Sequence, residues 1–482
     1  MIKRNRLIFS VLILFVFAVV SAGNVFAQKK PKEPLEFPKL NEIQIPKIEK
    51  LTLGNGLKLF LVEDHNFPTV DMRALVNTGS MFDPEEKTGL AELTGDVMRT
   101  GGTTTMKGDD IDQLLETMAA AVETRIGLDS GYVYVSMLKE TVDKVLPVFA
   151  DILRNPVFSE DKIVLVKTQK KTAIARRNDQ IMQIAFREFD KLIYGAKSPF
   201  AREPEYATVD AITRDDMVAF HKTYFHPNNM IMAVWGDFNT KEMVKKIKKV
   251  FGDWKSTPLH LPPLPEVNYE HTYSVNFIDK PDVNQSNIIL GHIGGMFNNP
   301  DLPALFVMNR ILSFDRMFKT IRTNEGLAYA VWGSYGAEFK YPGVFSAGAQ
   351  TKSESTVKAI KLMLNEMKRI TTEEVSDEEL KRAKDQYLNA YVFDFESKAE
   401  IIFRMLRLVY VDYPLDFSEK IKQGVENVTK ADILRVASKY LKPDKVRILV
   451  VGNKKDFDEP LSVLGDVNII DITIPPPPPA QH

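Results

Sequence analysis

Two pairs of side chains in this sequence have the types and spacing to do chemistry. Glu92 and Asp96 are four residues apart, which places both carboxylates on one face of a helix. Two oxygen ligands suit calcium or magnesium better than zinc and are too few for tight binding, so a solvated helix face is the simplest interpretation. Arg322 and Tyr329, seven residues apart with Gly326 between them, offer a fork of N–H donors and an O–H. By themselves they could equally be a surface arginine and a packed tyrosine.

The histidines and cysteines provide no alternative metal site. The chain has no cysteine, which excludes disulfides and thiolate ligands. No two of its histidines are three or four positions apart; they are His65, His221, His226, His260, His271, His292 and His482. His226 precedes Pro227 and is therefore expected beyond the end of the helix that contains His221. We expect surface or structural roles for all of them.

One pattern of residues occurs twice in the chain. The two sets, at a constant offset of 216, are Thr213, Tyr224, Pro227, Gly236 and Thr429, Tyr440, Pro443, Gly452. Each set predicts a helix with a threonine N-cap, a proline that ends it, and a buried apolar strand (230–234 and 446–451). A second match pairs the helix starts at Ser159 and Ser376. Self-similarity on this scale indicates a duplicated domain.

Within each half, strand-like and helix-like stretches are grouped more than they alternate. The segments 57–62 and 72–76 are predicted as paired strands after the turn at 54–56, and 132–137 as a further strand. Helices are predicted at 110–120, 140–153 and 161–178. This grouping favours an α+β fold with two homologous α/β-sandwich domains, each a mostly antiparallel sheet packed by helices.

The N-terminus has the pattern of a secretory signal peptide. Basic residues at 3, 4 and 6 precede an apolar run from Leu7 to Val20, and Val25-Phe26-Ala27 resembles a cleavage site. An uncleaved anchor is the alternative, although a membrane span needs about 20 apolar residues. The net charge of −1 gives no reason to expect nucleic acid as a partner. Export and the absence of cysteine fit a bacterial periplasm, or else an extracellular protein.

The segment from Asn77 to Thr103 carries a family resemblance. It reads NTGSMFDPEEKTGLAEL at 77–93 and continues TGDVMRTGGT. It resembles the metal-site region of the insulinase/pitrilysin family of zinc metallopeptidases, the processing-peptidase-like members in particular. The resemblance extends from about Leu51 to about Gly452 and includes RTNEGLAY at 322–329. It implies two related domains that close on a chamber.

The resemblance also implies that this chain lacks the zinc site. Active members carry His-x-x-Glu-His where this chain has Glu92 and Asp96 at the histidine positions and Gly95 at the general base. The family's third ligand, a glutamate, falls near Ala173. Glycine cannot take a proton from water and alanine cannot bind a metal, so we expect no metal or other cofactor in this chain.

The resemblance assigns a different role to Arg322 and Tyr329. In the family, such a pair holds the substrate backbone and supports the oxyanion. In two-subunit members, one chain carries the metal and the other supplies substrate contacts. We therefore expect a non-catalytic, substrate-binding subunit of a heteromeric exported zinc peptidase, with zinc in a related partner that bears His-x-x-Glu-His. An unstructured peptide would add as a strand to a sheet edge.

The sequence is also compatible with two alternatives. One is a structural or peptide-binding protein without a catalytic role, like the core subunits of the respiratory cytochrome bc1 complex. The other is an autonomous metallopeptidase with another metal arrangement. In either case the chain divides into a signal peptide (1–27), an N-terminal extension (28–44), a first peptidase-like domain (45–254), a Pro-rich linker (255–265), a second peptidase-like domain (266–465) and a Pro-rich tail (466–482). Its polyproline run, Pro475 to Pro479, is expected to be disordered or a short ligand for a partner.

Overall fold

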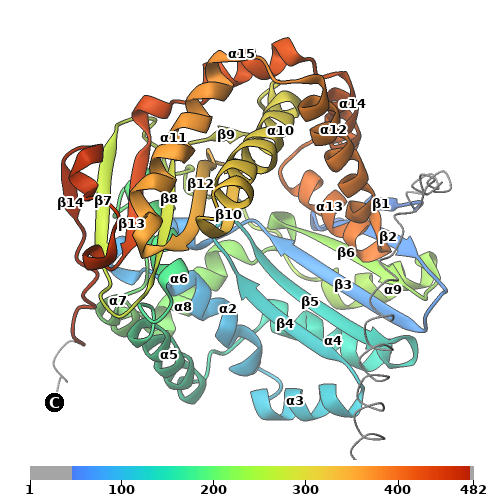
Figure 1. Ribbon diagram of the computed structural model, residues 1–482. Helices are drawn as coiled ribbons and strands as arrows, with labels where there is room; N and C mark the ends of the chain where they lie inside the picture. Colours follow the sequence, from blue (N-terminus) through green and yellow to red (C-terminus); the bar gives the residue numbers. More distant parts are fainter. Residues whose placement is uncertain (1–45, 478–482) are drawn as a thin grey trace, which may run out of the picture. The chain divides into compact units, whose positions relative to one another are not determined.

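The computed structural model describes residues 46–477 (Figure 1). The predicted signal peptide, the N-terminal extension and the last five residues lie outside the described residues. The described part contains two six-stranded sheets with helices, an α+β architecture as the sequence predicted. None of its helices has the length and apolar character needed to cross a membrane.

The first sheet is mostly antiparallel. Its strands lie in the order β1 (Glu49–Thr52), β2 (Lys58–Glu63), β6 (Met230–Gly236), β3 (Thr69–Val76), β5 (Gly131–Leu138) and β4 (Ala121–Ile126). Only the pairing of β2 with β6 is parallel in this sheet. The helices of this half are α2 (Leu90–Thr100), α3 (Gly108–Thr117), α4 (Val142–Arg154), α5 (Glu160–Ala175), α6 (Ile181–Tyr194), α7 (Tyr206–Ala211), α8 (Arg214–Tyr224) and α9 (Thr240–Phe251).

The second sheet repeats the order of the first. Its strands are β10 (Ala328–Tyr335), β12 (Val344–Lys352), β8 (Gln285–Ile293), β13 (Arg447–Gly452), β7 (Ser274–Asp279) and β14 (Val467–Ile469). Its helices are α10 (Leu302–Arg310), the wide π-type helix η5 (Ile311–Asn324), α11 (Thr356–Thr372), α12 (Asp377–Tyr391), α13 (Lys398–Tyr410), α14 (Phe417–Asn427) and α15 (Lys430–Tyr440). Thus β7, β13, β8, β12 and β10 take the places of β2, β6, β3, β5 and β4.

The helix starts confirm the internal duplication. Thr213 and Thr429 each accept a hydrogen bond from the backbone N–H three residues later, and the aspartate there bonds back to the threonine N–H. These capping boxes satisfy two N–H groups that an isolated helix start would leave unpaired. Both helices end three residues before the predicted prolines, and an apolar strand follows each proline.

The strand pairing around β2 corrects one prediction. β2 and β3 were predicted to pair with each other, but β6 lies between them, parallel to β2 and antiparallel to β3. All seven residues of β6 are buried, and a strand with two buried faces belongs inside a sheet. The turn at Gly54–Gly56 joins β1 to β2 instead, and Gly56 takes a φ of +87° that favours glycine.

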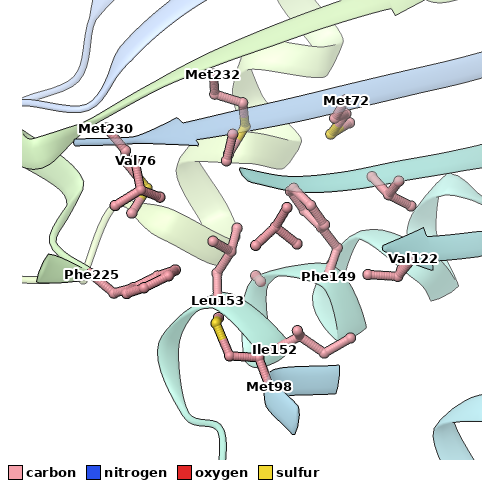
Figure 2. Close-up of a cluster of buried hydrophobic side chains, with 14 of the residues drawn as sticks. Met72, Val76, Met98, Val122, Phe149, Ile152, Leu153, Phe225, Met230 and Met232 are labelled. Atoms are coloured by element: carbon pink, nitrogen blue, oxygen red, sulfur yellow. The ribbon is translucent and has the colours of Figure 1, made fainter. Parts of the chain in front are cut away.

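Each half has its own apolar core. In the first half, Phe149 and Leu153 of α4 belong to the same core cluster as Met72 and Met232 of the sheet, and Ile152 lies beside Met98 of α2 (Figure 2). A separate cluster forms between the second sheet and helices α10, α11 and α15. Residues 255–265 form neither helix nor strand. The segment after residue 466 begins with β14, and Ile470 and Ile472 then pack against a buried cluster, so this part of the predicted tail belongs to the folded structure.

The two halves exchange one helix each. Helix α6 belongs to the first half by sequence but packs on β8 and β13 of the second sheet, through Ile184 and Phe189. Its counterpart α13, 217 residues later, packs on β6 of the first sheet, through Ile402 and Leu406. Each sheet therefore buries one face under a helix from the other half, which makes both halves depend on each other for burial.

Polar contacts reinforce this exchange. The Lys340 ammonium donates to Asn77 Oδ1 (3.0 Å), to the Asp129 carbonyl oxygen (2.9 Å) and to the Tyr410 hydroxyl (2.7 Å). Arg407 of α13 binds the Asp129 carboxylate with both terminal nitrogens. All three donors of the Lys340 ammonium are used, so this lysine joins the two halves without leaving an unmet donor.

The Phe189→Ala variant tests the helix exchange. Phe189 is buried between α6 and the second sheet, so we expect the free energy of unfolding to fall by about 3–5 kcal/mol. Urea denaturation followed by circular dichroism measures this change. Phe186→Ala on the same helix is the control, because Phe186 is 40% exposed and should cost far less. Equal losses for both variants would contradict the packing described.

Candidate functional site

Helix α2 begins with an unusual cap. Gly89 precedes it with a φ of +105°, and the buried Asp83 carboxylate accepts hydrogen bonds from the N–H groups of Gly89 (3.0 Å) and Ala91 (3.1 Å). Burial raises the pKa of Asp83 to about 7, against the opposing effect of these hydrogen bonds. The cap fixes the start of the helix that carries Glu92, Gly95 and the rest of the degenerate metal motif.

Gly95 marks the closest approach of α2 to strand β4. A Cβ built on Gly95 would lie 2.6 Å from the Ile126 backbone nitrogen and 3.1 Å from the Arg125 carbonyl carbon. The Gly95 carbonyl oxygen accepts a hydrogen bond from the Thr124 hydroxyl at 2.6 Å. Backbone atoms cannot move aside as a flexible side chain can. The general-base position therefore lacks a carboxylate and also lacks the space for one.

The neighbouring carboxylate, Glu92, is bound to a lysine. Lys170 of α5 places its ammonium 2.5 Å from Glu92 Oε2. Asp96 is partly exposed to solvent. Its partial burial raises its pKa, and the negative charge of Glu92 raises it further. Lys170 and Arg125 oppose that shift. Lys170 and Arg125 thus supply the positive charge next to these two carboxylates.

These residues do not fit a zinc ion. Ala173 lies exposed on α5, whereas Lys170 of the same helix reaches toward Glu92. In residues 46–477, no group of three or more potential ligand side chains is placed to hold a metal. Two carboxylates, one already paired with an ammonium, lack the nitrogen ligands that zinc prefers.

A cavity of about 240 Å³ lies beside Glu92. Arg187 and Asp190 of α6 and the loop 199–204 form part of its wall. Burial raises the pKa of Asp190 to about 6, and the nearby Glu203 carboxylate adds to this effect. The cavity is therefore lined by charges of both signs.

Arg322 and Tyr329 are brought together on the second half. The Arg322 Cζ atom lies 5.7 Å from the centre of the Tyr329 ring and 5.2 Å from that of Phe318. Tyr329 is 74% exposed. Gly326 adopts a φ of +65°, a conformation that glycine reaches without strain, and so turns the chain from η5 into β10. In the part of the chain that the structure describes, no hydrogen bond or ion pair joins this pair to Glu92 or Asp96.

A β-bulge sets Tyr329 apart from the regular pairing of strand β10 with β12. Ala328 pairs with Thr351 and Ala330 pairs with Gln350, so Tyr329 is the extra residue between two ladder positions. β10 lies at the edge of its sheet, where one side of the backbone has no neighbouring strand. Arg322 and Tyr329 therefore lie together beside an edge that could pair with an extended peptide.

Sequence reasoning did not single out three of these residues. Lys170 falls within the run KTQKK, where basic residues replace the acidic ligand that the family resemblance places nearby. That charge reversal was the available signal. Phe318 is four residues before Arg322, a helical spacing that could have predicted their contact. Asp190 has no signal in the sequence, because its raised pKa depends on burial in the fold and on Glu203, 13 residues later in the chain.

The family models match both halves of the chain. Residues 58–194 match the model described as Insulinase (Peptidase family M16), and residues 211–387 match the one described as Peptidase M16 inactive domain. The chain belongs to the insulinase family, as the residues at 77–103 and 322–329 predicted.

Individual relatives include proteins named as proteases and as non-peptidases. An "uncharacterized zinc protease" of Rickettsia felis is 26% identical, covering 80% of this chain and 93% of the relative. The "non-peptidase homolog YmxG" of Helicobacter pylori is 21% identical, covering 82% and 91%. The structure of "the periplasmic protease PqqL from Escherichia coli" has the same fold, with a TM-score of 0.72 and 13% identity. It covers 91% of this chain, which spans only 50% of PqqL.

The Gly95→Ala variant tests whether α2 packs too closely against β4 to accept a side chain at position 95. Alanine favours helices over glycine by about 1 kcal/mol, so on propensity alone the variant would be more stable. Because its methyl group would overlap the Ile126 backbone, we expect instead a loss of about 2 kcal/mol or more in the free energy of unfolding. Chemical denaturation decides the sign. Gly54→Ala, where no atom lies within 4 Å of the added carbon, is the neutral control. A stabilised Gly95→Ala protein would show that this position is open.

Proposed function

We propose that this chain is the non-catalytic, substrate-binding subunit of a heteromeric peptidase. A related partner chain would carry His-x-x-Glu-His and its zinc, and this chain would contribute Arg322 and Tyr329. The observation that carries the proposal is the contrast between the two sites. The general-base position is a glycine packed against the β4 backbone and the Glu92 carboxylate is paired with the Lys170 ammonium, while Arg322 and Tyr329 lie together and exposed.

The chemistry of the pair suits a developing oxyanion. When a peptide carbonyl is attacked, negative charge collects on its oxygen, and donors already aimed at that oxygen stabilise the transition state. The Arg322 guanidinium offers N–H donors and a fixed positive charge, and Tyr329 offers an O–H. Neither side chain is engaged in an ion pair within residues 46–477, so both are available to a bound peptide.

The edge strand β10 supports extended peptide as the substrate class. A peptide that pairs with the backbone of a sheet edge gains hydrogen bonds from its own main chain, whatever its sequence. The bulge at Tyr329 would place the tyrosine next to such a peptide. This arrangement favours unstructured peptides over folded proteins.

The length relation to PqqL supports a partner of similar size. This chain corresponds to half of that periplasmic protease, so PqqL has room for two units of this kind in one polypeptide. We propose that here the second unit is a separate chain. The predicted signal peptide and the periplasmic location in the name of PqqL support export to the periplasm.

Peptide cleavage by the assembled complex tests the proposal. We expect this chain alone to be inactive and its mixture with a zinc-motif relative from the same locus to cleave an unstructured peptide. Arg322→Ala should lower kcat about 10²- to 10³-fold, and Tyr329→Phe should also lower it, because each removes a donor to the transition state. Tyr269→Phe is the control, because it removes a hydroxyl from another exposed tyrosine (53% exposed, against 74% for Tyr329).

The other outcomes separate the alternatives. Unchanged kcat in both variants would refute the proposal. If the variants had no effect but the chain still bound the peptide, a peptide-binding or structural role would remain. Cleavage by the chain alone, abolished by a chelator, would point to an autonomous metallopeptidase.

A further inference from the structure

Among the residues that the structure describes, Arg322 has aromatic neighbours but no acidic partner. Its guanidinium lies over the rings of Phe318 and Tyr329 and forms no ion pair with any residue in the range 46–477. Contacts to ring faces restrain the guanidinium and leave its N–H edges available to an acceptor. An exposed arginine in this state keeps its full positive charge for a ligand.

A carboxylate stands close in the sequence and could neutralise that charge. Glu325 follows Arg322 by three residues, at the end of helix η5. Both side chains are exposed and long, and opposite charges only three residues apart in the chain attract each other. Pairing between them would occupy the N–H donors that a substrate oxygen needs.

Glu325 is held by a different residue. Lys358, in the first turn of α11, places its ammonium 2.6 Å from Glu325 Oε2. Lys358 comes from an element that is remote in sequence, so this contact depends on the packing of α11 against η5.

We propose that Lys358 is a positioning residue that keeps Glu325 away from Arg322. By binding the glutamate, it leaves the Arg322 charge uncompensated for the substrate oxygen that becomes negative during cleavage. This inference rests on the proposed function, since it concerns the ligand of Arg322. It assigns Lys358 an effect on the reaction although Lys358 itself need not touch the substrate.

The chain contains a closely matched control pair. Lys361 lies three residues further along α11, and its ammonium is 2.7 Å from Glu459 Oε1. The two lysines are 52% and 47% exposed, and the two glutamates 40% and 43%. Removing Lys361 thus breaks a similar exposed ion pair without releasing the acid next to Arg322.

Chemical modification of Arg322 by phenylglyoxal tests the inference in the intact chain, without a partner. The reagent attacks arginine side chains, and mass spectrometry of the tryptic peptides gives the rate at Arg322. We expect Lys358→Ala to slow this rate up to about fivefold, the range expected for one exposed ion pair. Lys358→Ala/Glu325→Gln should restore the wild-type rate, and Lys361→Ala should leave it unchanged.

Two results of this measurement would overturn the inference. One is a wild-type rate in Lys358→Ala, which would mean that the released Glu325 does not reach Arg322. The other is failure of Glu325→Gln to restore the rate, which would assign the effect to altered packing. Glu325→Gln alone should react at least as fast as the wild type.

Peptide cleavage by the complex provides the functional readout. Lys358→Ala should lower kcat by a similar factor at low salt, and added Glu325→Gln should recover it. The loss should shrink in about 1 M salt, where charges are screened beyond about 3 Å. If Arg322→Ala lowers kcat but Lys358→Ala does not, this inference fails and the proposed function stands. If Arg322→Ala itself has no effect, the proposed function fails.

Discussion

The packing of one helix from each half on the sheet of the other half is the interaction on which the remaining structure depends. Each sheet has two apolar faces, and its own half covers only one of them. Helix α6 covers the second sheet and α13 covers the first, so neither half buries its sheet completely without the other. The Lys340 and Asp129 contacts lie at the same junction. Loops near the cavity and elements near Arg322 are thereby held in one folded unit.

On this shared scaffold, the two halves have diverged in chemistry. In the first half, the helix that would carry a metal packs so closely on β4 that Gly95 has no room for a side chain, and a lysine provides the local positive charge. In the second half, an arginine and a tyrosine remain exposed beside an edge strand, and the nearby acid is bound elsewhere. Such a division of properties suits a protein that binds substrate for a catalytic centre on another chain.

Local sequence patterns predicted the repeated unit and part of the site. The threonine caps, the prolines and the apolar strands recur with constant spacing, because helix ends and buried strands have strong local signals. Arg322 and Tyr329 were both named from one short segment, RTNEGLAY, and their role stays a prediction. The pairing of β2 with β6 could not be read in this way, because the strands are separated by more than 160 residues. The steric role of Gly95 and the bond between Lys358 and Glu325 depend likewise on the packing of distant elements.

The most direct test of the proposed function is to measure which residues lie next to position 329 in the assembled complex. A photo-crosslinking amino acid, p-benzoylphenylalanine, placed at position 329 would react with the nearest chain on illumination. Mass spectrometry of the crosslinked peptides would then identify the contact. We expect crosslinks to the partner peptide that contains His-x-x-Glu-His or to a bound substrate peptide. Crosslinks only within this chain, or to a partner surface remote from that motif, would contradict the proposed function.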